Sequence, residues 1–301
     1  MGNQKNFNII FSVIIGIVFL VCISFFVVSF ILPIGDTSMD DNTIKNDYNP
    51  NGSNYSNDDN INNINNSAEI TPENSDESRI AELEEKIREN EIKLKDPYLI
   101  LVNKSNPMPE DYVMPQMVGL SLDSARKMEI MAASKLELFL AKAKEEGHNV
   151  IYVVSAYRDK STQQTNYDAK ISEYMGLGYS REDAEKRTLE FIAPPGFSEH
   201  QTALVADVAQ EKELNSEKLA QTPFFIYANE NIHKYGYIVR YQKGKELVTG
   251  YSAEPWHFRY VGIEAATYMH EKNLSLEEYI DHLNLNITAA EQELATLKKK
   301  N

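Results

Sequence analysis

Cysteine is almost absent from this sequence: Cys22 is the only one in 301 residues. A disulfide within the chain is therefore excluded, and the folded part must be stabilised by an apolar core. Cys22 itself lies in an apolar run. The residues directly before it, Phe19, Leu20 and Val21, are not the small residues that lipoprotein cleavage would want.

Basic residues are the second shortage. The chain has 30 Lys and Arg against 45 Asp and Glu, which gives a net charge of −15 and a pI of about 4.9. A nucleic-acid partner would need a basic face to meet its phosphates. The composition therefore argues against a nucleic-acid-binding protein, and we expect no nucleic-acid partner.

Histidine is also scarce, with six residues in the whole chain. Four of them occupy ordinary helix-like or loop contexts, where a histidine is usually a surface or core residue: His148, His233, His270 and His282. The other two, His200 and His257, stand in stretches that also contain carboxylates. These two stretches therefore hold the candidate functional residues.

The two stretches together predict a metal site. Residues 197–207 read FSEHQTALVAD and supply His200 and Asp207, and residues 254–258 read EPWHF and supply His257. Two histidines and one carboxylate are a complete protein ligand set for a catalytic zinc, with the fourth position left for water. Asp207 lies in the apolar run ALVADVA, which reads as a short buried strand. A carboxylate there is costly unless it is paired or binds a metal.

Glu254 is the spare carboxylate of this arrangement, three residues before His257. Zinc lowers the pKa of a bound water to about 7, so hydroxide becomes available at neutral pH. A base for that water must lie near the metal without binding it. Glu254 is therefore the candidate general base.

The pattern resembles a known enzyme family. Ser198-x-His200, then Asp207 seven residues after the histidine, then Glu254-Pro-Trp-His257, is similar to the SxHxxGxAxD and ExxH motifs of the VanY-like zinc D-alanyl-D-alanine carboxypeptidases. These motifs define the family's metal site. The resemblance therefore implies a Zn²⁺ cofactor for this chain.

The resemblance extends beyond the metal motifs. Upstream, Ser155, Arg158 and Gln163 in SAYRDKSTQ match a second family motif, and the similarity continues through residues 238–262. It covers roughly residues 97–282. Two positions depart from the pattern, since Ala203 stands where the family has Gly and Val205 where it has Ala. Neither is a ligand, but both add bulk beside the metal strand.

The resemblance implies a carboxypeptidase that removes the C-terminal D-Ala from peptidoglycan stem peptides. Cleavage of the L,D bond of a tetrapeptide stem is the alternative. Arg158 is the candidate for gripping the substrate carboxylate, because a guanidinium stays charged and binds it with two hydrogen bonds; it could instead stabilise the oxyanion. Ser155, Gln163 and Ser198 are candidate hydrogen-bond donors to the peptide. Trp256 either lines the pocket or packs in the core.

Two other classes compete with this interpretation. Ser124-Ala-Arg-Lys127 matches the SxxK element of penicillin-sensitive serine peptidases, but only Val248-Thr-Gly250 stands for the companion KTG, and the domain is small for that class. The second rival is a wall-binding module with weakened catalysis, which the departures at positions 203 and 205 favour. The intact Glu254 argues against it, because a structural zinc site needs no spare base.

The N-terminal region predicts a membrane anchor. Residues 8–34 are almost wholly apolar, which exceeds the ~20 residues needed to span a bilayer. A signal peptide would have a shorter apolar region and a small-residue cleavage site. We interpret residues 1–35 as a retained transmembrane signal anchor. Lys5 before the run places the N-terminus inside, so the catalytic domain of a single-pass cell-membrane protein lies outside.

Residues 36–78 predict a disordered linker. They hold ten acidic residues and one lysine, and 11 of the 25 residues in 42–66 are Asn. Such a segment cannot bury enough apolar surface to fold. A helical stalk then runs from Arg79 to Lys95, before Pro97, with its apolar residues on one stripe. It either packs back on the domain, stands as a charged stalk, or pairs weakly with a second copy.

Residues 97–283 predict an α+β domain, in which helices pack on a small antiparallel sheet. Expected strands cover residues 98–103, 150–155 and 237–241, with a hairpin returning through 247–251 into 254–258. Expected helices cover 122–146, 162–173, 181–191, 224–235, 261–271 and 276–283. Residues 284–301 predict a partly frayed terminal helix. Arg240 and Arg259 are expected to be structural.

Overall fold

The computed structural model describes residues 72–149, 151–210 and 216–300 of the chain. The predicted anchor and most of the predicted linker lie outside these residues. Among the helices that are described, none is both long and apolar enough to cross a membrane.

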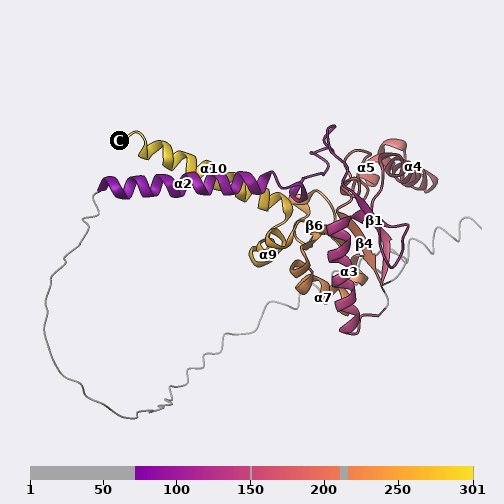
Figure 1. Cartoon of the computed structure of the whole chain (residues 1–301). Helices are drawn as coiled ribbons and strands as arrows, with labels where there is room; N and C mark the ends of the chain where they lie inside the picture. The colour runs from indigo at the N-terminus through magenta and orange to yellow at the C-terminus, as the bar shows by residue number, and fades with distance from the viewer. Residues whose placement is uncertain (1–71, 150, 211–215, 301) are drawn as a thin grey trace, which may run out of the picture. The chain divides into compact units, whose positions relative to one another are not determined.

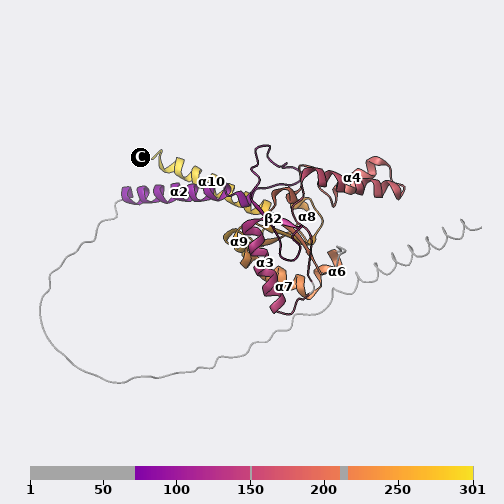
Figure 2. The same cartoon turned by 45° about the vertical axis from the view of Figure 1, so that its right-hand side comes forward.

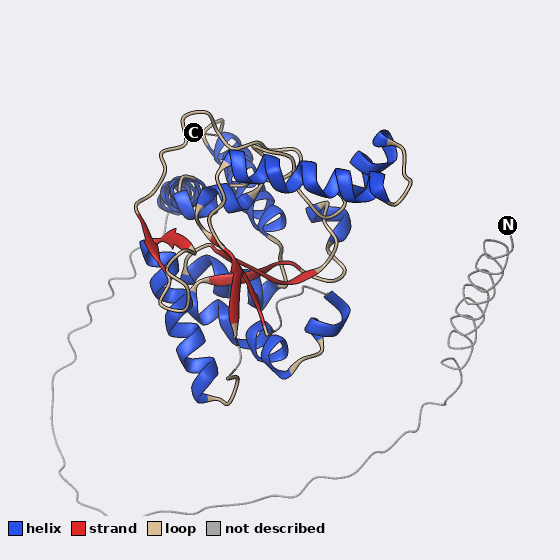
Figure 3. Ribbon diagram, turned by 90° about the vertical axis from the view of Figure 1, so that its right-hand side faces the viewer, coloured by secondary structure: helices blue, strands red, loops and turns tan. Residues whose placement is uncertain are grey.

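A four-stranded antiparallel sheet forms the centre of the domain (Figure 3). Its strand order is β3 (Tyr152–Ser155), β4 (Val205–Ala209), β6 (Glu254–Tyr260) and β5 (Tyr237–Tyr241). A second, two-stranded sheet pairs β1 (Met117–Gly119) with β2 (Lys127–Glu129). The α+β class with small antiparallel sheets is confirmed, and β5 has the predicted bounds.

The sheet separates the main core from the opposite face. Successive side chains of a strand point to opposite sides, and Ala206, Val208 and Phe258 lie in the main hydrophobic core. Helices α3 (Ile130–Glu145) and α7 (Pro223–Asn231) cover this core, with Phe139 and Phe224 packed against Phe258. Asp207 and His257 alternate with the core residues, so they lie on the other face.

A second cluster packs at the β5 edge of the sheet. It joins Ile238 of β5 to Met269 on α9 (Ile263–Lys272) and to Leu276 and Leu283 on α10 (Leu276–Leu297). The start of α10 is fixed by a reciprocal capping box, in which Ser275 and Glu278 each accept a hydrogen bond from the other's backbone N–H. The cluster therefore fixes the base of α10 against the sheet.

Helix α2 (Pro72–Leu94) lies antiparallel along α10 (Figure 1). Arg79 forms an ion pair with Glu293 at 2.7 Å and Lys298 one with Glu84 at 2.8 Å, while Leu83 is buried. Packing back on the same chain is therefore the arrangement adopted by the predicted stalk. Leu83, on the apolar stripe that was left open for weak pairing with a second copy, is buried here within the same chain.

Two predicted boundaries are wrong as a result. The helix begins at Pro72, so the last seven residues of the predicted linker, 72–78, are helical. The predicted break between the domain and its tail at residue 284 does not exist, because α10 runs unbroken from Leu276 to Leu297. Both helices extend beyond their predicted bounds because α2 and α10 pack against each other, which stabilises turns that would fray in an isolated helix.

Three predicted elements are replaced by other structures. Residues 98–103 form no strand; a short 3₁₀ helix, η1 (Pro97–Leu99), stands at their start. The helix predicted from residue 122 starts eight residues later, because a turn and β2 precede α3. The return strand predicted at residues 247–251 is instead mostly the short helix α8 (Glu246–Thr249), and β6 pairs directly with β5.

Helices α4 (Lys160–Gly176) and α5 (Arg181–Leu189) form an arm that projects from the domain, on the side away from α2 (Figures 1 and 2). Both helices were predicted, and each is capped by a side chain: Asp159 accepts from the backbone N–H of Thr162, and Ser180 from that of Asp183. Two short elements, α6 (Ser216–Ala220) and η3 (Ile232–Tyr235), pack beside α7.

Candidate active site

The predicted metal ligands come from three elements that meet on the non-core face of the sheet. His200 lies in the 3₁₀ helix η2 (Glu199–Thr202), Asp207 in β4 and His257 in β6. Asp207 and His257 are directly opposed across the two strands. All three side chains are buried. The sheet register therefore brings together residues that are about fifty positions apart in the sequence.

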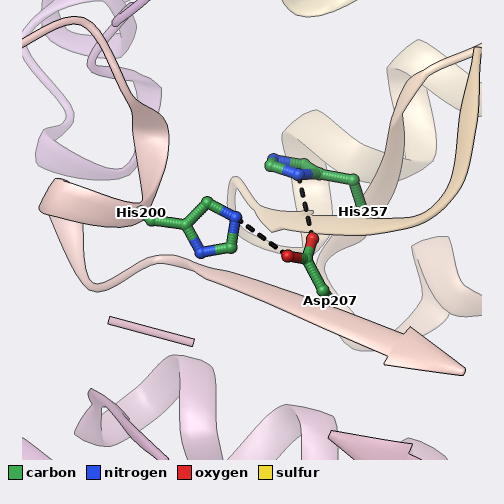
Figure 4. Close-up of side chains that lie close together, drawn as sticks. All are labelled: His200, Asp207 and His257. Atoms are coloured by element: carbon green, nitrogen blue, oxygen red, sulfur yellow. Dashed lines mark ion pairs between the residues drawn. The ribbon is translucent and has the colours of Figure 1, made fainter. Parts of the chain in front are cut away.

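Both imidazoles point at the Asp207 carboxylate (Figure 4). His200 Nε2 lies 3.2 Å from Asp207 Oδ2, and His257 Nδ1 lies 3.1 Å from Asp207 Oδ1. One ligand atom from each of the three residues lies within 4.8 Å of the others. Within the described part of the chain, this is the group of His, Cys, Asp and Glu residues that could hold a metal ion.

The donor set and its charge fit a zinc ion. Two nitrogens and one oxygen leave a fourth position open, as in catalytic zinc sites. Burial alone would raise the pKa of Asp207, but the two histidines hold it far below its usual range. Burial alone would lower the pKa of His257, but Asp207 and Glu199 raise it to about 9. Burial, with Arg158 nearby, lowers the pKa of His200 and so favours the neutral imidazole that binds a metal. The ionised Asp207 beside it supplies the negative charge that a metal cation needs.

A backbone carbonyl orients His200. The His200 Nδ1 atom lies 2.6 Å from the carbonyl oxygen of Ala156, to which it can donate, and this leaves Nε2 facing Asp207. Such a hydrogen bond from the second ring nitrogen is the usual support of a metal-binding histidine. The backbone N–H of Arg158 in turn donates to the carbonyl of His200 at 3.0 Å.

Glu254 lies beside the cluster without joining it. Its Oε2 atom is 3.5 Å from His257 Nδ1. Burial raises the pKa of Glu254 to about 7; His257 and Arg158 lower it and Asp207 raises it. This is the environment expected of a carboxyl group that exchanges protons near neutral pH.

A pocket of about 710 Å³ opens onto the cluster. Five predicted site residues besides the three candidate ligands line it: Arg158, Gln163, Ser198, Glu254 and Trp256. Gln163 donates from Nε2 to the carbonyl of Ala193 at 2.7 Å, and its Oε1 has no hydrogen-bond partner among the described residues. Ser155 lies opposite Asp207 in β3 but does not line the pocket.

The structure also brings in residues that sequence reasoning missed. Five of them line the pocket, and of these Tyr241 contacts the ring of His257: Lys170 and Tyr174 of α4, Phe191 after α5, Tyr241 and Tyr251. The missed residue closest to the candidate ligands is Glu199, directly before His200 and fully buried. Residue types gave no signal for Glu199, because its neighbours Ser198, His200 and Gln201 are polar and do not indicate a buried position.

Ala203 has a left-handed backbone. It ends η2 with φ 64° and ψ 14°, and it is fully buried. A glycine adopts this conformation without steric cost, whereas the Ala Cβ does not. The departure at position 203 therefore affects the backbone at the turn into β4. Val205 is buried opposite Arg259 in the β4–β6 ladder.

The other sequence candidates lie elsewhere. His233 and His270 stack on each other with ring centroids 3.8 Å apart, His148 contacts Tyr227, and His282 contacts Tyr268. The SxxK match is not a motif in three dimensions. Ser124 lies in an exposed turn and Lys127 in β2, so the two do not share the helix that a serine peptidase needs.

Comparison with known proteins identifies the family. The family described as "VanY: D-alanyl-D-alanine carboxypeptidase" matches residues 125–263. A D-alanyl-D-alanine carboxypeptidase of Enterococcus faecalis (strain ATCC 700802 / V583) is 36% identical over 211 residues, which cover 69% of this chain and 73% of the relative.

Two solved structures extend this comparison. The zinc complex of a Glu-to-Ala mutant of the vancomycin resistance D,D-pentapeptidase VanY, from a VanB-type resistance cassette, is 36% identical with a TM-score of 0.54. It covers 62% of this chain and 99% of that one. The LdcB LD-carboxypeptidase is 36% identical with a TM-score of 0.50, covering 62% of this chain and 88% of that one.

The fold and the site thus define a zinc metallopeptidase of the carboxypeptidase type. The chain belongs to the VanY D-alanyl-D-alanine carboxypeptidase family.

Proposed function

We propose that this enzyme removes the C-terminal D-Ala from peptidoglycan stem peptides that end in D-Ala-D-Ala. The observation that carries the proposal is the buried group of His200, Asp207 and His257 with Glu254 beside it, in a chain of the VanY family. The activity named for the Enterococcus faecalis relative supports this choice of substrate.

We assign the zinc ligands to His200 Nε2, the Asp207 carboxylate and His257 Nδ1, because these atoms converge in the structure. When bound, Zn²⁺ polarises a carbonyl group and lowers the pKa of a coordinated water. The chain's own part is to keep both imidazole rings fixed in a buried site. The carbonyl of Ala156 does this for His200.

Glu254 is the proton carrier in this proposal. Its carboxylate accepts a proton from the attacking water and passes it to the nitrogen of the departing D-Ala, while water oxygen bonds to the carbonyl carbon and the peptide C–N bond breaks. The position of Glu254 beside His257 and its pKa of about 7 support both transfers.

Arg158 is the candidate anion-binding group. Its side chain lines the pocket, and its Nε has no hydrogen-bond partner among the described residues. A guanidinium binds a carboxylate through two hydrogen bonds, so Arg158 suits the free C-terminus that a carboxypeptidase substrate presents. Gln163, Ser198 and Trp256 complete the substrate contacts in this proposal.

Mass spectrometry of defined stem peptides tests the proposal. We expect a pentapeptide ending in D-Ala-D-Ala to lose one D-Ala, and we expect a chelator to stop the reaction and added zinc to restore it. Full activity in a metal-free sample would refute the zinc mechanism. Absence of any released amino acid would refute the carboxypeptidase assignment.

The L,D reaction is the second candidate, because the LdcB LD-carboxypeptidase is as similar to this chain in sequence as the VanY structure. The same experiment separates the two reactions. A tetrapeptide stem shortened by one residue, with the pentapeptide left intact, would favour the L,D alternative.

We also propose that the enzyme is anchored in the cell membrane by residues 8–34, with its catalytic domain outside. The support is the length of this apolar run and Lys5 before it. Protease added to intact cells should release the domain by cleavage between residues 36 and 71. A mature soluble protein that begins after residue 34 would contradict the anchor.

A further inference from the structure

We propose that Glu199 is a positioning residue for His257: its carboxylate accepts the Nε2–H of that imidazole and so keeps Nδ1 directed at the metal. This inference rests on the proposed zinc ligands, and its substance is the geometry around the second ring nitrogen of His257.

The first observation is the place of the Glu199 side chain. It is completely buried, and its Oε2 atom lies 3.4 Å from His257 Nε2. At this distance the two atoms form an ion-pair contact, and neither has a hydrogen-bond partner among the described residues. A buried carboxylate oxygen and a buried ring nitrogen are both costly when they are left alone. Within the described part of the chain, each is therefore the group placed to satisfy the other.

The second observation is that two arginines fix the orientation of this carboxylate. Glu199 Oε1 accepts from Arg240 Nε and from Arg259 Nη1, each at 2.8 Å. Because Oε1 is held by two charged donors, the carboxylate cannot rotate without breaking both hydrogen bonds. Oε2 is thus held toward His257 and away from other donors.

The two arginines, Arg240 and Arg259, are fixed in turn by further hydrogen bonds. Arg240 donates from both terminal nitrogens to Glu277, at 2.8 and 2.6 Å. Arg259 donates to the carbonyls of Tyr98, Ile100 and Tyr260 at 2.8–3.0 Å. Two glutamates balance two arginines, so the buried group carries no net charge, and every charge in it is paired.

The two histidines are consequently supported in opposite ways. His200 donates its Nδ1–H to a backbone carbonyl and presents Nε2, whereas His257 faces Glu199 through Nε2 and presents Nδ1. Glu199 and His200 are neighbours in η2. The short helix η2 therefore supplies His200, a proposed ligand, and Glu199, which positions His257. In this way η2 is linked to β6, the strand that carries His257.

Glu199→Gln tests the assignment in the full chain. An amide can offer its oxygen either to the arginines or to His257, but it cannot accept from both sides as a carboxylate does. We expect the zinc affinity, measured by competition with a chelator, to fall by about 10–100-fold, the usual effect of losing such a support.

Glu277→Gln is the matched control. It removes the same charge from the same buried group and leaves Arg240 partly unpaired, but Glu277 binds Arg240 and does not touch either histidine. We expect both variants to unfold at lower temperature and only Glu199→Gln to lose zinc affinity. Equal losses of zinc affinity in the two variants would overturn the proposal, as would parent affinity in Glu199→Gln.

A measurement on the parent protein covers the case in which the variant fails to fold. In the zinc-loaded chain labelled with ¹⁵N in its histidines, we expect the His257 Nε2–H to be present and protected from exchange with solvent. A proton on Nδ1 instead, or a rapidly exchanging Nε2–H, would refute the role of Glu199. A proton on Nδ1 would also remove this atom from the proposed zinc ligands, whereas a rapidly exchanging Nε2–H would refute the role of Glu199 alone. Neither result bears on whether D-Ala is released, which the stem-peptide experiment measures separately.

Discussion

At the scale of single residues, the difference between a ligand and a base is set by small displacements. Glu254 and Asp207 are both carboxylates beside His257, at 3.5 and 3.1 Å. Asp207 lies between the two imidazoles, which hold it ionised, whereas Glu254 lies at the edge of the group and its pKa is raised to about 7. In the proposed mechanism, the same functional group thus serves two purposes in two environments.

Glu254→Gln should separate these purposes. The amide keeps the shape of the side chain but cannot accept a proton, so we expect D-Ala release to fall by about 10²–10⁴-fold. Zinc content should stay at the parent value, because Glu254 is not among the three converging ligands. Zinc content and D-Ala release are measured on the same sample.

Glu264→Gln provides the control for this prediction, since Glu264 is an exposed carboxylate on α9 that pairs with Lys93. It should behave as the parent. Loss of zinc from Glu254→Gln would show that this residue is a ligand, and an unchanged rate would place the base elsewhere.

Ala203→Gly should be neutral or stabilising, although a substitution by glycine usually destabilises a folded protein. The left-handed conformation costs an L-residue about 1–2 kcal/mol, and removing Cβ at position 203 relieves it. Loss of the buried methyl group and the greater freedom of glycine in the unfolded chain offset part of this gain. We expect a free energy of unfolding between the parent value and about 1 kcal/mol above it.

Ala206→Gly is the matched control in denaturant unfolding. Ala206 is equally buried but lies in β4 with ordinary strand geometry. Glycine in a strand interior costs about 0.5–1 kcal/mol, to which the lost methyl group adds. Equal destabilisation by the two substitutions would mean that the backbone at position 203 is not strained.

At the scale of elements, the sequence predicts those whose pattern matches their surroundings. Strand β5 has the bounds that its YIVRY run predicts, and β4 lies in the predicted apolar run. The run at residues 98–103 fails as a strand because its carbonyls find a different partner. The Arg259 side chain, rather than a neighbouring strand, donates to the carbonyls of Tyr98 and Ile100. A distant side chain of this kind leaves no local signal.

The same limit applies to the site. The candidate ligands and the candidate base Glu254 follow from motif spacing, because each motif is continuous in the sequence. The wall formed by Lys170 and Tyr174 depends on how α4 projects from the domain, and the support by Glu199 depends on two arginines, 41 and 60 residues away. Neither could be read from residue types alone.

Leu83→Ala tests the pairing of α2 with α10. Leu83 is 2% exposed on α2, and removing a buried leucine side chain costs about 2–5 kcal/mol. Helices α2 and α10 can separate locally while the rest of the domain stays folded. We therefore expect the lost stability to appear as faster amide exchange toward the C-terminal end of α10. Zinc affinity should not change.

Ile92→Ala is the matched control on the same helix, since Ile92 is 63% exposed. Because surface substitutions usually change stability little, the amide exchange rates of α10 should stay close to those of the parent protein. Parent-like protection of α10 in Leu83→Ala would contradict the pairing.

At the scale of the whole folded unit, helices α2 and α10 bring distant parts of the chain together. Arg79 pairs with Glu293 and Lys298 with Glu84, and 214 positions separate the members of each pair. Residues 97–300 alone would therefore leave one side of α10 uncovered. A soluble fragment for biochemical work should begin before Pro72.

The antiparallel arrangement of α2 and α10 has a practical consequence for circular permutation and for fusion to other domains. The first turns of α2 and the last turns of α10 lie side by side at one tip, on the opposite side of the domain from α4 and the pocket wall (Figure 1). Ends that lie this close can be joined by a short flexible peptide. A circularly permuted domain without residues 1–71, opened at the exposed turn at Gly147, which does not line the pocket, should then keep the catalytic pocket intact. A reporter domain fused beyond the last turn of α10 should likewise stay clear of the substrate.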